Sequence, residues 1–141
     1  RHGDQRSYAI GSQHFAKNLP EGVNARFAIN LDMVGDQMLT IPREKNSDRY
    51  APDVMNLIYS TARDIRVTEF VNGIGEEIFD DHIPLNEAGI PSADLIDFNY
   101  PDNSNRYWHS LEDTPDKCSP ASLEAVGKVL LHIIYAKPIP F

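Results

Sequence analysis

The sequence predicts one α/β domain, residues 1–141, with a mixed, mainly parallel sheet and helices on both faces. Residues 25–34 are nearly continuously apolar, which is typical of a strand covered on both faces. Residues 93–98 form a second apolar run, interrupted by two aspartates. Segments with helical spacing, tight turns and strands alternate along the chain, and this order belongs to an α/β domain. A length of 141 residues is ordinary for a single domain.

Four segments carry helix signals. Residues 7–18 can form a helix with Ser7 as N-cap, and residues 52–66 begin with Pro52 at the first helical position. A short helix begins at Asp80 and ends before Gly89, which is a common C-terminal residue. The last helix follows the cap pair Ser119-Pro120 and runs to Tyr135, with a helical stripe of Leu123, Val126, Leu130 and Ile134.

The remaining segments are predicted as short strands and loops. Residues 37–43 form a short strand, which Pro42 places at a sheet edge. Residues 67–71 form another strand. The polar residues 44–49, the turn-rich residues 72–75 and the irregular stretch 99–117 are predicted as loops.

Charge and composition exclude several classes of protein. The net charge is −8 and the 13 basic residues are scattered, which argues against nucleic acid as a partner. No apolar run approaches the length of a membrane span. Cys118 is the single cysteine, so the chain forms neither an internal disulfide nor a cysteine-rich zinc site, and we interpret it as structural. The chain begins at Arg1 in a stretch typical of a loop interior, so we expect it to be part of something longer.

A histidine and several aspartates stand just past predicted strand ends or at helix starts: Asp32, Asp80, Asp81 and His109. In α/β sheets, sites lie outside the carboxyl ends of the strands. Zinc takes imidazole and carboxylate ligands, so this mixture suits zinc better than calcium. A paired structural Asp32 and a surface His109 remain the alternatives at this level. The sequence has no Gly-x-Ser-x-Gly turn, which leaves serine hydrolysis poorly supported.

Other acidic and histidine residues lack this context. His2-Gly3-Asp4 and Glu76-Glu77 do not follow an apolar strand, and we interpret both as solvated loop residues. His132 lies inside the last helix and is predicted to be a partly buried helix residue.

Three motifs, taken in order, resemble the zinc-dependent aminopeptidase and glutaminyl cyclase superfamily. They are Asn30-Leu31-Asp32-Met33-Val34-Gly35, Asp80-Asp81-His82-Ile83-Pro84 with Ala88-Gly89-Ile90-Pro91, and Trp108-His109-Ser110 with Glu112-Asp113-Thr114. The resemblance implies the zinc exopeptidase architecture, one or two zinc ions, and the N-terminus of a peptide as substrate. It also suggests a secreted or periplasmic protein.

The resemblance implies a role for each site residue. His109 corresponds to the last metal ligand. Asp32 corresponds to the carboxylate that binds the second zinc in aminopeptidases and joins an acid network in the cyclases, and Asp80 resembles a member of that network. Trp108 resembles the aromatic wall of the cyclase pocket. Supporting positions around the ligands are implied for His82 and Asp81.

The chain departs from the family pattern in one respect. The family's remaining ligands and its general base precede the helix matched by residues 7–18, so the chain resembles the C-terminal half of a domain. We therefore expect the isolated chain to be inactive, with an exposed sheet edge that pairs with the other half or self-associates. For the complete domain, we expect aminopeptidase hydrolysis. Glutaminyl cyclisation is the alternative activity, and a non-catalytic remnant is the third possibility.

Overall fold

The computed structural model describes residues 7–136. Its elements, in chain order, are α1 (Ile10–Lys17), β1 (Ala28–Asp32), β2 (Ile41–Arg43), α2 (Lys45–Tyr50), α3 (Pro52–Asp64), β3 (Phe70–Ile74), α4 (His82–Glu87), β4 (Ser92–Ile96), the short 3-10 turn η2 (Pro115–Lys117) and α5 (Pro120–Tyr135).

The strands form two parallel pairs. β1 pairs with β4, and Asp32 lies opposite Ile96 at their carboxyl ends. β2 pairs with β3, from Ile41 opposite Phe70 to Arg43 opposite Ile74. All five residues of β4 are buried, as the apolar run predicted. The parallel pairing confirms the α/β class.

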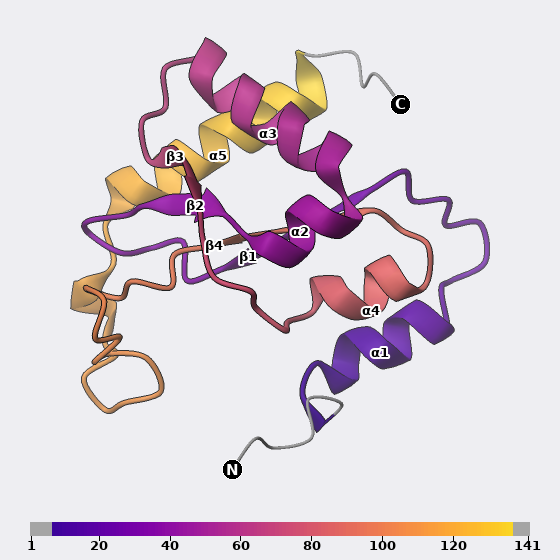
Figure 1. Cartoon of the computed structure of the whole chain (residues 1–141), viewed down its shortest axis with the longest axis horizontal. Coiled ribbons are helices and arrows are strands. Elements are labelled where there is room, and N and C mark those ends of the chain that lie inside the picture. The colour runs from indigo at the N-terminus through magenta and orange to yellow at the C-terminus, as the bar shows by residue number, and fades with distance from the viewer. Residues whose placement is uncertain (1–6, 137–141) are drawn as a thin grey trace.

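Helices cover both faces of the strands. Figure 1 shows α3 and α5 together on one side, and α1 and α4 on the opposite side. Apolar side chains from α3, α5 and the strands form one core. Its fully buried members include Ile41, Met55, Ile58, Leu95 and Ile133. The predicted placement of helices on both faces is therefore confirmed.

Residues 44–49 were predicted as a loop, and that prediction is wrong because the chain forms α2 there. The Glu44 side chain caps the helix by accepting hydrogen bonds from the backbone N–H of Asn46 (2.9 Å) and Ser47 (2.5 Å). The N–H of Ile78, far along the chain, donates to the same carboxylate at 2.9 Å. Glutamate is not a usual N-cap residue, so the cap depends on a tertiary contact that local patterns do not contain.

Other boundaries also differ from the sequence prediction. β2 covers Ile41–Arg43 rather than residues 37–43. Ser7 is not the N-cap of α1; Ala9 holds that position in a left-handed conformation and has no capping hydrogen bond from its side chain. β3 covers residues 70–74 rather than 67–71, so most of the predicted 72–75 loop is strand. Pairing with β2 decides this register, because Gly75 N–H donates to the carbonyl of Arg43 at 2.8 Å.

The remaining helix predictions agree with the structure. α3 begins at Pro52, and Ser119 caps α5 by accepting from Ala121 N–H at 3.2 Å. Gly89 follows α4 with a φ of +86°, a conformation that favours glycine. None of the helices in residues 7–136 has the length and apolar character that crossing a bilayer requires.

Candidate functional site

Two aspartates meet at the carboxyl end of β1. Asp32 is the last residue of β1, and Asp80 lies in the segment that leads into α4. Burial, and after it a hydrogen bond shared with the Asp80 carboxyl, raise the pKa of Asp32 from 3.8 to about 6. A shared bond of this kind keeps one proton between two carboxyls. The pair is therefore a proton-holding acid pair at a strand end.

The acid pair adjoins the loop that carries His109. A cavity of about 170 Å³ is lined by Asp32, Met33, Tyr100, Trp108, His109 and Asp113. The Trp108 and His109 rings are stacked, with their centroids 4.1 Å apart, and Phe98 meets Trp108 edge-on. The structure thus brings together Asp32, His109 and Trp108, which are distant in sequence. We call this space the His109 cavity.

The backbone on both sides of the His109 cavity is in a left-handed conformation. Met33 has a φ of 50° and His109 a φ of 54°. Residues other than glycine rarely adopt this region, and such positions concentrate at functional sites. The two segments that carry the acid and the imidazole are therefore held in unfavourable conformations by their surroundings.

Asp81 is exposed and does not line the His109 cavity. Its backbone N–H donates to Oδ1 of Asp80 at 2.6 Å, which orients that carboxyl. Its own charge adds a small contribution to the raised pKa of Asp32. Asp81 thus influences the acid pair through its backbone N–H and its charge, although its side chain does not line the His109 cavity.

His82 is fully buried and also lies away from the His109 cavity. Its Nε2 lies 3.3 Å from Oε2 of Glu44, and its Nδ1 lies 3.7 Å from Oδ2 of Asp94. We call these three residues the buried histidine cluster. The cluster joins the start of α2, the start of α4 and the middle of β4 beneath the acid pair.

The two carboxylates of the buried histidine cluster differ in pKa. Burial raises the pKa of Glu44, but hydrogen bonds from His82, Ile78, Ser47 and Asn46 outweigh it and lower the pKa to about 2. Asp94 accepts from the Asn30 amide at 3.0 Å, yet its burial dominates and raises its pKa to about 7. Several donors facing one carboxylate explain the opposite outcome at Glu44.

The described residues supply an incomplete donor set for zinc. His109 and Asp32 have the chemistry of zinc ligands and line one cavity. Within residues 7–136, however, no three His, Cys, Asp or Glu side chains converge as a metal site. A zinc site normally needs three or four protein ligands. The residues present fit zinc only together with further donors.

Sequence reasoning missed Tyr100, Asp113 and Asp36. The Tyr100 hydroxyl donates to Oδ1 of Asp113 at 2.7 Å, and both residues line the His109 cavity. They also line an adjoining cavity of about 240 Å³, together with Asp32, Met33, Gly35, Asp36 and Cys118. Asp36 follows the first apolar strand and Tyr100 follows the last, and Asp113 lies in the third family motif, but no spacing rule selects these residues among their polar neighbours.

Glu76, Glu77 and His132, which were set aside earlier, are outside both cavities. Glu76 and Glu77 are exposed, and Glu77 lies 3.7 Å from the Arg49 guanidinium. His132 is partly buried in α5, as predicted. The His2-Gly3-Asp4 stretch lies outside the described residues.

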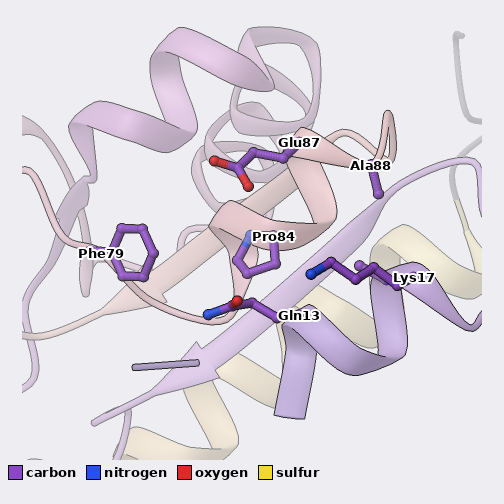
Figure 2. A pocket seen from close by; sticks show the side chains of 7 residues that line it. Gln13, Lys17, Phe79, Pro84, Glu87 and Ala88 are labelled. Carbon is purple, nitrogen blue, oxygen red and sulfur yellow. The ribbon is translucent and has the colours of Figure 1, made fainter. Parts of the chain in front are cut away.

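A cavity of another kind lies between α1 and α4 (Figure 2). It encloses about 560 Å³, and Lys17 and Glu87 are the charged residues among those that line it. Gln13, Phe79 and Pro84 supply the rest of the labelled lining together with Ala88. Among the described residues that line this space there is no histidine and no acid pair, so its chemistry differs from that of the strand-end cavities.

A parallel α/β fold with carboxyls and an imidazole at its strand ends defines the class: an α/β protein whose site can contribute metal ligands. The chain belongs to Peptidase family M28, whose family model matches residues 7–134. This family and its zinc-dependent members imply zinc. A search of curated proteins found no significant match to the chain.

Solved structures agree with the family assignment. A Bacteroides thetaiotaomicron glutaminyl cyclase bound to N-acetylhistamine is 31% identical, with a TM-score of 0.88 over 98% of this chain. A leucine aminopeptidase precursor from Bacteroides thetaiotaomicron is also 31% identical, with a TM-score of 0.87 over 98% of this chain. A Zn-dependent exopeptidase from Parabacteroides distasonis is 31% identical, with a TM-score of 0.88 over 97% of this chain.

This chain covers 49%, 48% and 49% of those three chains, respectively. It therefore spans about half the length of the solved proteins that it matches. Both cyclases and exopeptidases share its fold.

Proposed function

We propose that the complete domain containing this chain is a zinc-dependent aminopeptidase that acts at peptide N-termini. One observation carries the proposal: Asp32 and His109 line a single cavity at the carboxyl end of β1. In this proposal both are metal ligands, and the remaining ligands and the general base come from outside the described residues. A bound zinc ion would polarise the first peptide carbonyl and lower the pKa of water.

The chain's own residues prepare this site in the proposal. Asp80 holds the Asp32 carboxyl through their shared hydrogen bond, and Asp81 orients Asp80 through its backbone N–H. Trp108 forms an apolar wall beside His109, where a substrate side chain can pack. His82 fixes the start of α4, and therefore the approach of Asp80, from below.

A second candidate is glutaminyl-peptide cyclisation, in which the amine of an N-terminal Gln attacks its own side-chain amide. The acid pair of Asp32 and Asp80 favours it, because a carboxyl pair that shares a proton can accept one from an amine and return it. The Trp108 wall also suits a flat amide side chain. The third candidate, a non-catalytic remnant, predicts that neither reaction occurs.

Product analysis with the complete domain separates the three candidates. Peptides that begin with Leu and with Gln are incubated with the protein and followed by mass spectrometry. Release of the free N-terminal residue supports the aminopeptidase, and loss of ammonia from the Gln peptide alone supports the cyclase. Asp32→Asn and His109→Ala should each reduce the rate by about 100-fold or more, whereas His132→Ala should not. No turnover of any peptide would contradict both enzymatic candidates.

The number of zinc ions is a separate question. Native mass spectrometry of the same protein should detect one or two zinc ions, and His109→Ala should lower zinc occupancy. One ion favours the cyclase and two favour the aminopeptidase. Unchanged occupancy in His109→Ala would contradict the ligand assignment.

The open edge of β1 suggests where the other ligands lie. Among the described residues β1 pairs only with β4. Leu31 on β1 is 45% exposed, although it belongs to the apolar run that predicted a covered strand. We infer that a strand from the rest of the domain covers this edge and carries the missing donors. A secreted or periplasmic location is part of the same proposal.

A further inference from the structure

The cavity next to the His109 cavity is acidic. It holds about 240 Å³ and is lined by the carboxylate residues Asp32, Asp36 and Asp113, together with Met33, Gly35, Tyr100 and Cys118. No lysine or arginine is among these described lining residues. We call it the Asp36 cavity.

Asp36 is the unusual member of this lining. It is only 5% exposed, and its Oδ2 atom is buried with no hydrogen-bond partner in the described part of the chain. Its Oδ1 accepts from the N–H of Met38 at 3.3 Å, and its backbone carbonyl accepts from the Ser122 hydroxyl at 2.6 Å. These two hydrogen bonds fix the position of Asp36, but its second carboxylate oxygen has no partner among the described residues. Such an oxygen is costly to bury unless a donor or a cation reaches it.

Cys118 faces the same cavity as Asp36. The two residues form an antiparallel bridge, flanked by hydrogen bonds from Gln37 N–H to the Lys117 carbonyl (3.2 Å) and from Ser119 N–H to the Gly35 carbonyl (2.8 Å). Residues directly opposite each other in such a bridge project to the same side. A Cβ at Gly35 would lie 3.0 Å from the Cys118 Sγ, so glycine leaves the room that the thiol occupies.

The nearest basic side chain does not neutralise the cavity. Lys117 places its Nζ 2.5 Å from Oδ2 of Asp116 and 5.3 Å from the centre of the Tyr107 ring. Its ammonium is therefore engaged outside the lining and does not pair with Asp36.

The Asp36 cavity adjoins the site of the proposed reaction. It shares Asp32, Met33, Tyr100 and Asp113 with the His109 cavity. Neighbouring residues of an extended peptide are about 3.3–3.6 Å apart along the chain. A peptide whose N-terminal residue occupies the His109 cavity can therefore place the next side chain in the Asp36 cavity.

We infer that the Asp36 cavity is a specificity subsite for a lysine or arginine side chain directly after the N-terminal residue of the substrate. The inference rests on the proposed function for the position of the peptide. The ammonium or guanidinium group donates to the unpaired Oδ2 of Asp36, and Asp113 lines the same cavity. The aliphatic stem packs between Tyr100 and Met33.

Kinetics of the complete domain test the subsite directly. Two peptides that differ only in Lys or norleucine at the second position are compared by kcat/KM, each with the N-terminal residue that the protein turns over. The Lys peptide should be preferred by about tenfold or more. Asp36→Asn keeps the acceptor for Met38 N–H and should abolish the preference, so that kcat/KM for the Lys peptide falls to that for the norleucine peptide. Glu87→Gln removes the same charge from the cavity between α1 and α4, and should keep the preference. If Asp36→Asn and wild type prefer the Lys peptide over the norleucine peptide to the same extent, the inference is overturned.

Labelling of Cys118 provides a readout that needs no turnover. Cationic and anionic methanethiosulfonate reagents of similar size are compared, and modification of the Cys118 peptide is followed by mass spectrometry. The cationic reagent should react several-fold faster in wild type and in Glu87→Gln, and this ratio should approach one in Asp36→Asn. Charge-selective labelling without turnover of any peptide would refute the proposed function and keep the cationic subsite. Turnover with no charge selectivity at Cys118 would refute the subsite alone.

Discussion

One group of acids lies inside the fold and another lies at the carboxyl end of β1, and the two groups behave differently. In the buried histidine cluster, Glu44 and Asp94 face an imidazole that lies inside the fold. In the acid pair, Asp32 and Asp80 face each other beside a cavity, and the carboxyl neighbour raises the Asp32 pKa. The comparison teaches that a carboxylate whose partner is inside the chain maintains structure, whereas a carboxylate that faces another carboxyl beside a cavity is available for an external cation or proton.

Removal of the shared imidazole should have the largest effect on stability. His82→Ala leaves Glu44 and Asp94 buried without their common neighbour, and should lower the free energy of unfolding by about 3–5 kcal/mol. Urea unfolding measures the change. His14→Ala, at an exposed position in α1, is the control and should stay within about 0.5 kcal/mol. Equal losses in both variants would contradict a structural role for the cluster.

Asp94 should make the protein less stable as pH rises. Burial raises its pKa from 3.8 to about 7, so the folded state binds more protons than the unfolded state between these values. The free energy of unfolding therefore falls across this window, by up to about 4 kcal/mol from this group. Asp94→Asn should lose that fall when urea unfolding is compared near pH 4 and pH 7. The exposed-carboxylate control Glu87→Gln should retain it, and an identical pH slope in Asp94→Asn and wild type would contradict the prediction.

Glu44 should act in the opposite direction. Its pKa is lowered from 4.5 to about 2, so its contribution is fully present above about pH 4.5 and is lost as pH falls towards 2. The contribution is about 3 kcal/mol. Glu44→Gln should therefore be less stable than wild type near pH 6, and the difference should shrink near pH 3. Unfolding curves at both pH values check this, and a difference independent of pH would sink it.

The acid pair should give the smallest change in stability. Asp80→Asn removes a carboxyl neighbour of Asp32 without removing a partner needed for folding, so the free energy of unfolding should change by less than about 1 kcal/mol. The pKa of Asp32 should fall below its present value of about 6 but stay raised by burial. Carbon-13 NMR titration of the Asp32 carboxyl measures this shift. An unchanged Asp32 pKa would show that the two carboxyls do not share a proton.

Much of the fold could be predicted because its signals are local. The caps at Pro52 and Ser119 and the apolar run around β4 each reside in a few consecutive residues. The helix at residues 44–49 could not be predicted, because its cap is a glutamate held by a hydrogen bond from Ile78. The same limit applied to β3, whose start depends on its register against β2.

The candidate site was predicted in part for the same reason. Asp32, Asp80 and His109 follow predicted strands or open a helix, so general rules pointed to them, and the family resemblance proposed their roles. Asp36 and Tyr100 also follow predicted strands, but so do other polar residues, and their place in a cavity depends on how the loop after β4 folds over the end of β1.

The sequence by itself determined the α/β class, the position of Asp32 at a strand end and the motifs of the M28 family, because these depend on periodicity and on neighbouring residues. The tertiary structure alone decided which acids meet an imidazole and which meet another acid. Glu44, His82 and Asp94 come from three separate segments of the chain. Asp36 and Cys118 likewise come from two separate segments. The shifted pKa values of Glu44 and Asp94 and the unpaired oxygen of Asp36 follow from burial and from distances across the fold, which no local pattern encodes.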